Sequence, residues 1–373
     1  MIDPNRVALF ERVARRGDVE LLVVYETVME ANRKWAAPVE LPYRHEVLRS
    51  RSLDLRRLGT DAYLHLPRHP LESIRAFRPE VLVAAGGGIW SSPANVLAYA
   101  TRRSEGWAFV PWWGSFGKDH PSRARMLAER WVRRFLSQSD LCIAYGSRSS
   151  GELRRLGVDP AAIHIVPNAV PPGDTEREES RPHRPLRYLF VGQLIERKGV
   201  PDLLAAFSNL PHGELYVAGD GPLRDAVIQA AQEHRVVYVG HLGRSELHAL
   251  YARTDVLVLP SRYEVWGLVV NEAMGHGLPV IASDAVGAVD DLIEPGVNGY
   301  VFRAGDRAGL QDAMAQFASW DARRWLAAAN TGATLAHRWS MDAAAEAFVE
   351  ACHSALRRRE DRAADSATAR KVG

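Results

Sequence analysis

Short apolar runs alternate with amphipathic stretches along most of the chain. Runs of this length are typical of buried strands, and the stretches between them carry apolar residues at helical spacing. In the first half the runs lie at residues 19–25, 61–66, 80–86, 106–112 and 140–146. In the second half they lie at residues 187–192, 214–219, 236–240, 255–260, 279–283 and 299–302. Strands that alternate with helices predict an α/β fold with a doubly wound parallel sheet in each half.

A polar segment without periodicity separates the two halves. Residues 171–185 contain prolines and acidic residues and no apolar pattern, which indicates a linker. We therefore predict a Rossmann-like N-terminal domain at 1–170 and a Rossmann-like C-terminal domain at 186–340, facing each other across a cleft. A helix at 341–358 could cross back to the N-terminal domain, and 359–373 would form a flexible tail.

Composition and charge exclude several classes of protein. The chain is 47% hydrophobic and 25% charged, as in ordinary globular proteins, and its formal net charge of +2 implies no nucleic-acid partner. Two cysteines cannot form a disulfide framework or a Cys-rich zinc site. No signal-peptide pattern opens the chain, and no window approaches the ~20 apolar residues that span a bilayer. These features predict a cytoplasmic protein.

One amphipathic helix could still bring the protein to the inner membrane surface. The segment 122–136 is rich in arginine, and a basic amphipathic helix can contact anionic lipid head groups. A solvated helix face, with Glu129 placed among the arginines, is the alternative interpretation.

The second half places a lysine and two glutamates around glycine-containing turns. Lys198 follows a buried strand and precedes a helix that starts near Gly199, where a cation can meet an anion beside the helix end. Glu264 and Glu272 flank a turn into another helix. Carboxylates accept two hydroxyls, which suits the diols of sugars, and the free amides of a helix start can receive a phosphate.

These segments resemble the retaining glycosyltransferases of family 4, which have the GT-B fold. The resemblance rests on FVGQLIERKG at 190–199 and PSRYEVWGLVVNEAMGHGLPVIAS at 260–283, with support from AGDGPLR at 218–224 and EPGVNGYVF at 294–302. It covers essentially all of 185–340 and is looser in the first half.

The resemblance implies a hexosyltransferase that moves a sugar from a nucleotide-diphosphate donor to an acceptor hydroxyl, with retention and without a metal. Glu264 would bind hydroxyls of the donor sugar, Glu272 those of the ribose, and Lys198 the diphosphate, with Lys198 and Glu264 as the catalytic residues. The donor-binding residues implied in full are Gly192, Gln193, Lys198, Glu264, Gly267, Leu268, Val269 and Glu272. No cofactor is expected, because the nucleotide-sugar is a co-substrate, and a UDP-sugar is slightly favoured over a GDP-sugar.

Two departures from the family pattern keep an alternative open. Gln193 stands where the family commonly has an arginine at the diphosphate, and the first strand and glycine-rich loop of the N-terminal domain are missing from the predicted elements. A non-catalytic nucleotide-sugar binder or partner subunit is therefore the alternative. A dehydrogenase is disfavoured because no strand is followed by G-x-G-x-x-G with an acidic residue about 20 positions on.

The acceptor side is less defined. Gly87 and Gly88 follow a strand, and Trp113 and His120 follow another, at the strand ends that face ligands in such sheets. Trp113 could stack on a sugar and His120 could help proton transfer, although a core tryptophan and a surface histidine are the ordinary alternatives. The acceptor could be a saccharide, a lipid-linked molecule or a small metabolite.

Overall fold

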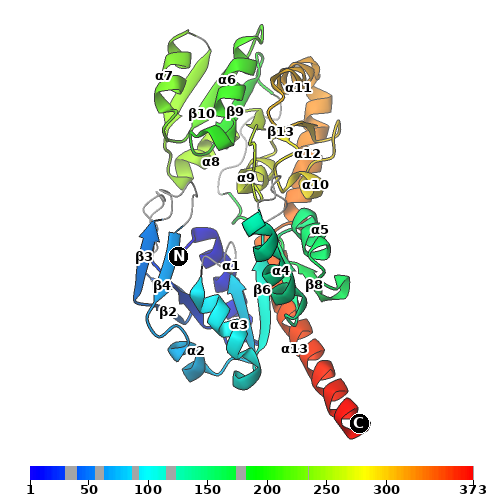
Figure 1. The fold of residues 1–373 in the computed structure, drawn as a ribbon. Helices are drawn as coiled ribbons and strands as arrows, with labels where there is room; N and C mark the ends of the chain where they lie inside the picture. The colour runs from blue at the N-terminus through cyan, green and yellow to red at the C-terminus, as the bar shows by residue number, and fades with distance from the viewer. Residues whose placement is uncertain are drawn as a thin grey trace. The chain divides into compact units, whose positions relative to one another are not determined.

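The computed structural model describes residues 1–29, 40–54, 63–85, 92–114, 123–173, 182–233 and 235–372. The chain divides into two compact units. Unit 1 comprises Met1–Pro167 together with Met341–Gly373, and unit 2 comprises Asn168–Ser340. Figure 1 shows the fold coloured along the chain.

Unit 2 is built on a parallel sheet of six strands in the order β11-β10-β9-β12-β13-β14. The strands are β9 (Arg187–Val191), β10 (Glu214–Ala218), β11 (Val236–Gly240), β12 (Val256–Leu259), β13 (Val280–Ser283) and β14 (Gly299–Phe302). Successive strands move outward from β9 on one side and, from β12 on, outward on the other side. The strand order therefore reverses between β9 and β12, which is where doubly wound sheets bind their ligands.

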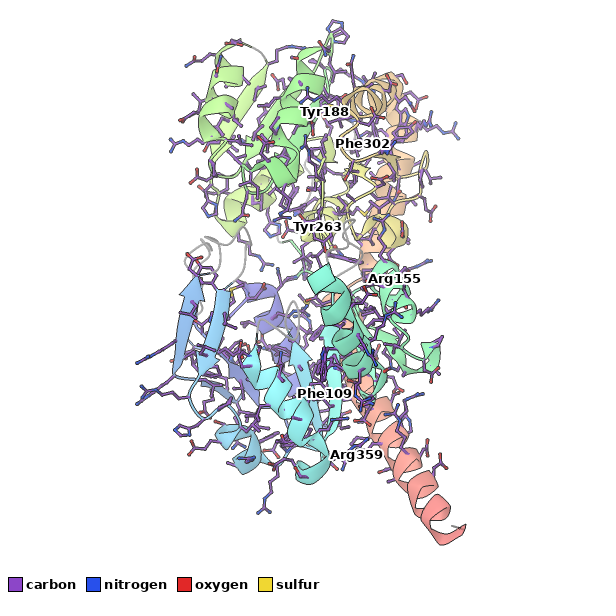
Figure 2. All side chains as sticks on the ribbon, in the orientation of Figure 1. Phe109, Arg155, Tyr188, Tyr263, Phe302 and Arg359 are labelled. Carbon is purple, nitrogen blue, oxygen red and sulfur yellow. The ribbon has the colours of Figure 1, made fainter. Side chains whose placement is uncertain are left out.

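The helices of unit 2 cover this sheet. They are α6 (Val200–Ser208), α7 (Arg224–Glu233), α8 (Arg244–Ala252), α9 (Leu268–Gly275), α10 (Val289–Leu292), α11 (Arg307–Ser319) and α12 (Ala322–Arg338). One apolar cluster of unit 2 includes Tyr188 and Phe302, both labelled in Figure 2, and Phe207 and Phe317. Parallel strands that helices cover are mainly apolar, which explains why sequence patterns located all of the described strands of this sheet.

Unit 1 contains a four-stranded parallel sheet and two small strand pairs. The parallel sheet has the order β5-β6-β7-β8, with β5 (Val81–Ala85), β6 (Ala108–Trp113), β7 (Cys142–Ala144) and β8 (Ile163–Ile165). Strand β1 (Val23–Tyr25) pairs in parallel with β2 (His45–Val47), and β3 (Ser50–Asp54) pairs antiparallel with β4 (Tyr63–Pro67). The core of the parallel sheet is formed by Phe109, labelled in Figure 2, and its buried neighbours.

The hairpin of β3 and β4 corrects one expectation. The run at 61–66 was predicted to join a parallel sheet, but its described part lies in β4 and pairs antiparallel with β3. Strand β3 is mostly exposed and largely polar, so it has no apolar run by which sequence could find it. The pairing is therefore decided by tertiary contacts.

The helices of unit 1 come from both ends of the chain. They are α1 (Pro4–Arg15), α2 (Glu72–Phe77), α3 (Pro93–Glu105), α4 (Arg123–Ser137), α5 (Ser147–Arg155) and α13 (Met341–Val372). Arg12 of α1 pairs with Asp342 at 2.7 Å, and the rings of Phe10 and Phe348 lie 6.0 Å apart. The C-terminal helix thus packs within unit 1.

Helix α13 is longer than the sequence predicted. It continues past residue 358 to Val372, through the segment expected to form a flexible tail. Arg358 donates to Asp159 at 2.7 Å, and Arg362 lies 3.5 Å from the carboxylate of Asp140. These ion pairs attach α13 to the rest of unit 1 beyond the apolar part of the helix. None of the described helices is both long and apolar enough to cross a membrane.

Candidate functional site

Lys198 and Glu264 meet where the strand order of the unit 2 sheet reverses. Strand β9 is followed by Gly192, Gln193 and the 3-10 turn Glu196–Lys198, and the loop after β12 carries Glu264. The ammonium of Lys198 contacts Oε2 of Glu264, and the two side chains are only 15% and 16% exposed. Two opposite charges that are largely shielded from water stabilise each other there.

Gly199 permits this contact. Its φ of +72° lies in the left-handed region, and a Cβ at this position would meet the carbonyl oxygen of Pro260. Because only glycine combines this φ with so close a backbone approach, the turn that carries Lys198 can lie directly against the loop after β12.

Backbone hydrogen bonds hold Glu264. Its amide donates to the carbonyl of Ala285 at 3.0 Å, and its carbonyl accepts from the amide of Gly287 at 2.9 Å. Arg197 approaches the same carboxylate, because its guanidinium donates to the carbonyl of Tyr263 at 2.8 Å and lies 3.9 Å from Oε2 of Glu264. Tyr263 is labelled in Figure 2. Two cations therefore face one carboxylate whose backbone is fixed on both sides.

Helix α9 begins beside Glu264 without a side-chain cap. Its N-cap is Gly267, with φ of +97°, and a Cβ there would lie 3.5 Å from the side chain of Glu264. The amides of Leu268 and Val269 are among the first of the helix, which have no acceptor within it. These amides and the positive end of the helix dipole form a place where an anion can bind.

Glu272 lies one turn further along α9 and accepts a hydrogen bond from a buried tyrosine. The hydroxyl of Tyr251 donates to Oε2 of Glu272 at 2.8 Å. Burial raises the pKa of the Glu272 carboxyl above its ordinary value, and the hydrogen bond from Tyr251 and the charge of Arg244 only partly oppose this. The hydrogen bond from Tyr251 therefore stabilises the charged form of Glu272, which burial disfavours.

Two histidines support Tyr251 from behind. Its ring stacks on His276 with the centroids 5.4 Å apart and the planes 12° apart. Nε2 of His276 and Nδ1 of His248 form a hydrogen bond of 2.7 Å between two buried rings. A stacked ring has few alternative positions, so its hydroxyl stays directed at Glu272.

Comparison with known proteins identifies the family. Residues 185–319 match the family described as glycosyl transferases group 1. This segment of the chain belongs to the family. The chain is 32% identical over 293 residues to a glycogen synthase of Mycobacterium tuberculosis, covering 72% of this chain and 64% of that protein. It is 28% identical over 264 residues to a sulfoquinovosyl transferase of Arabidopsis thaliana, covering 63% of this chain and 49% of that protein. The chain thus matches less than two thirds of the length of either relative.

Solved structures show the fold of this group 1 chain. HepE of Anabaena in complex with UDP superposes with a TM-score of 0.70 and 17% identity, covering 95% of this chain and 98% of that one. Sucrose-phosphate synthase of Thermosynechococcus elongatus superposes with a TM-score of 0.64 and 20% identity, covering 95% and 92%. Together with the family match, these structures confirm the predicted α/β class and the GT-B assignment with two Rossmann-like domains.

The structure places the predicted donor-side residues as follows. Lys198, Glu264 and Gly267 lie together, whereas Glu272 is bound to Tyr251. Gln193 is exposed, and its side-chain amide forms no hydrogen bond with the residues that the structure describes. No observation here tests the role of any of these residues, so the roles stay predictions.

Sequence reasoning missed the approach of Arg197 to Glu264, and it missed Tyr251 and the two histidines. A signal existed for part of this group, because Glu272 and His276 are four positions apart and therefore share a helix face. The contact of α9 with Tyr251 on α8 had no such signal.

The acceptor-side predictions fall in unit 1. Gly87, Gly88 and His120 lie outside the described residues. Trp113 ends β6, and its Nε1 is buried with no hydrogen-bond partner in the described part of the chain. Contact of Trp113 with an acceptor stays a prediction.

Proposed function

We propose that this chain is a retaining glycosyltransferase that moves a sugar from a nucleoside-diphosphate donor to an acceptor hydroxyl without a metal. The observation that supports this most directly is the cation of Lys198 on Glu264 beside the uncapped start of α9. Groups that can bind an anion and a carboxylate that can bind sugar hydroxyls are thereby adjacent at the strand-order reversal, inside the segment that matches the family.

The donor diphosphate would lie against Lys198 and the amides of Leu268 and Val269. Lys198 pairs with Glu264 in the structure, and a diphosphate would add a second anion to the same ammonium. Arg197 supplies another positive charge nearby, which compensates for the neutral amide of Gln193. In a site shielded from water these groups stabilise the charge that develops on the departing phosphate.

The two carboxylates would orient the two sugars of the donor. Glu264 would accept hydrogen bonds from hydroxyls of the transferred sugar, and Glu272 from the ribose diol. Oε2 of Glu272 already accepts from Tyr251, which sets the orientation of the carboxylate before the donor binds. Pre-organised groups lose less entropy when the ligand arrives.

In the transfer step the bond between the anomeric carbon and the phosphate oxygen breaks, and its electron pair goes to the phosphate. The acceptor oxygen forms the new bond to the anomeric carbon on the same face of the sugar. The acceptor proton passes to a phosphate oxygen of the leaving diphosphate. The protein's residues thus position two substrates and stabilise the leaving group.

A UDP-sugar is the donor we favour, since the HepE structures that resemble this chain include complexes with UDP and with UDP-glucose. The acceptor would be a saccharide, a lipid-linked molecule or a small metabolite. Contact with a membrane stays a prediction: α4 exposes 66% of Trp131 and also exposes Arg130 and Arg134. Sedimentation with anionic and with neutral vesicles measures it.

Thermal unfolding with a panel of nucleotides tests the proposed donor site. UDP, GDP, ADP and their glucose conjugates are added to the unaltered protein, to Glu272→Ala and to Glu214→Ala. Glu214 lies at the amino-terminal end of β10, away from the carboxyl ends of the strands where the candidate site lies, and serves as the matched control. One nucleotide should raise the unfolding temperature of the unaltered protein and the control but not of Glu272→Ala. No shift with any nucleotide would refute the donor site.

Catalysis is tested with the nucleotide that binds. Release of UDP from UDP-glucose, with and without EDTA, should proceed equally in both conditions if the transfer needs no metal. Binding without release, in the presence of a range of saccharide acceptors, would favour the alternative of a non-catalytic binder.

A further inference from the structure

Arg6 is a partly buried cation that has no acidic partner in the described part of the chain. It lies in the first turn of α1, and its guanidinium forms neither a hydrogen bond nor an ion pair with any residue described. The other arginines near this end of the chain do have acidic partners. The paired arginines are Arg12 with Asp342 at 2.7 Å, Arg15 with Glu11 at 2.5 Å and Arg16 with Asp18 at 3.0 Å.

Aromatic rings hold the guanidinium of Arg6. Its central carbon lies 3.9 Å from the ring centroid of Trp112 and 5.1 Å from that of Tyr145. Trp112 is 2% exposed, and the ring of Tyr145 occupies the space that a Cβ on Gly114 would need. Both rings are therefore fixed, and a planar guanidinium stacked on them is fixed with them.

Arg6 lies at the carboxyl ends of two parallel strands of unit 1. Trp112 lies at the carboxyl end of β6, and Tyr145 directly follows β7, the neighbouring parallel strand. Open α/β sheets bind ligands at this edge. The Nε1 groups of Trp112 and Trp113 are buried at the same strand end, and neither has a hydrogen-bond partner among the residues described.

The acid nearest to Arg6 in sequence is already engaged. The carboxylate of Asp3 accepts from the amide of Asn5 at 2.8 Å and from that of Arg6 at 3.3 Å, so it caps α1. Aromatic faces attract a guanidinium but accept none of its five in-plane N–H bonds. The fork of donors thus remains available, and its geometry matches an oxyanion that it can bind through two parallel hydrogen bonds.

We propose that Arg6 binds a phosphate group of a substrate at the strand-end edge of unit 1. The phosphate would belong to an acceptor that carries one, and the first arm of the experiment tests whether it belongs to the donor instead. The anion site follows from the geometry alone, whereas its assignment to a substrate rests on the proposed function.

The experiment compares the unaltered protein with Arg6→Gln, Arg6→Lys and Arg15→Gln. Arg15 is on the same helix, exposed and paired, so Arg15→Gln removes one charge without touching the edge of the sheet. In the first arm, calorimetry measures the affinity for UDP. In the second arm, millimolar inorganic phosphate is added with UDP at saturation, at constant ionic strength, and the unfolding temperature is measured. Unfolding temperatures without ligand report any loss of packing.

Each outcome decides the matter. A loss of UDP affinity of roughly tenfold in Arg6→Gln, a smaller loss in Arg6→Lys and none in Arg15→Gln would assign the phosphate to the donor. Unchanged UDP affinity with phosphate stabilisation absent only in Arg6→Gln would assign it to an acceptor. If Arg6→Gln matches Arg15→Gln in both arms, Arg6 is only a packing residue and the proposal is wrong. Failure of the unaltered protein to bind UDP would refute the proposed UDP donor, while the phosphate arm would still test Arg6.

Discussion

Substituting Tyr251 by phenylalanine removes one buried hydroxyl and leaves the ring stacked on His276. The hydroxyl donates to the carboxylate of Glu272 at 2.8 Å. A hydrogen bond to a charged group contributes about 1.5–3 kcal/mol, against about 1 kcal/mol for a neutral one. Tyr188→Phe is the matched control, because Tyr188 is equally buried in unit 2 and its hydroxyl donates at 2.8 Å to the neutral carbonyl of Met314.

The pH dependence separates the two variants. Burial already raises the pKa of Glu272, and loss of the Tyr251 hydroxyl, which lowers it, should raise this pKa further. A carboxyl whose folded pKa lies above its unfolded value contributes stability at low pH that is lost as pH rises through the folded pKa. Tyr251→Phe should therefore lose about 1.5–3 kcal/mol at neutral pH and much less at about pH 4, where Glu272 is protonated.

Urea unfolding of both variants across this pH range measures the effect. Tyr188→Phe should lose the same free energy of unfolding, about 1 kcal/mol, at every pH. UDP affinity gives a second measurement: it should fall several-fold in Tyr251→Phe, more steeply as pH decreases, and stay unchanged in Tyr188→Phe. Equal and pH-independent losses in the two variants would refute a charge-assisted bond between Tyr251 and Glu272.

Three further substitutions test other parts of unit 2. Lys198→Ala should lower kcat/KM by about 100-fold, because stabilisation of the leaving group is lost. Glu196→Ala, on the same turn, should leave kcat/KM unchanged. A similar kcat/KM for both variants in a transfer assay would contradict the role of Lys198. Gly199→Ala should destabilise by about 2 kcal/mol or more, because a Cβ meets the Pro260 carbonyl at a positive φ, while Gly275→Ala, with open space at its Cβ, should cost nothing in urea unfolding. Burial of Asp202 raises its pKa, but hydrogen bonds from Arg307 and Arg262 outweigh this and lower it. The stability that Asp202 contributes is therefore present above its unfolded pKa and is lost as pH falls through the lower folded pKa. The difference in urea midpoint between the unaltered protein and Asp202→Asn should shrink below about pH 4. A difference that stays constant with pH would argue against this contribution of Asp202.

The strands of unit 2 could be located from sequence because nearly all of their residues are apolar, as is typical of parallel strands covered by helices. Unit 1 was less predictable for the converse reason. Strand β3 is exposed and polar, and it is a strand only because β4 pairs with it. The last part of α13 has no apolar pattern, and it is attached by Arg358 to Asp159 and by Arg362 to Asp140.

The candidate site divides in the same way. Lys198, Glu264 and Glu272 were found from local order, because a strand, a glycine turn and a helix start are adjacent in sequence and together present a cation, carboxylates and free amides. The partner of Glu272 could not be found in this way, since Tyr251 is 21 positions away on another helix and its hydroxyl is directed by a ring stacked on a third side chain.

The sequence by itself therefore determined the alternation of strands and helices, the family, and which residue types stand at the strand ends. Those properties are local, because periodicity and glycine turns act over a few residues. Only the tertiary structure decided that Arg197 turns to Glu264, that Tyr251 supports Glu272, and that Arg6 lies on Trp112 more than a hundred positions away. Such contacts depend on packing between distant segments, which no local pattern encodes.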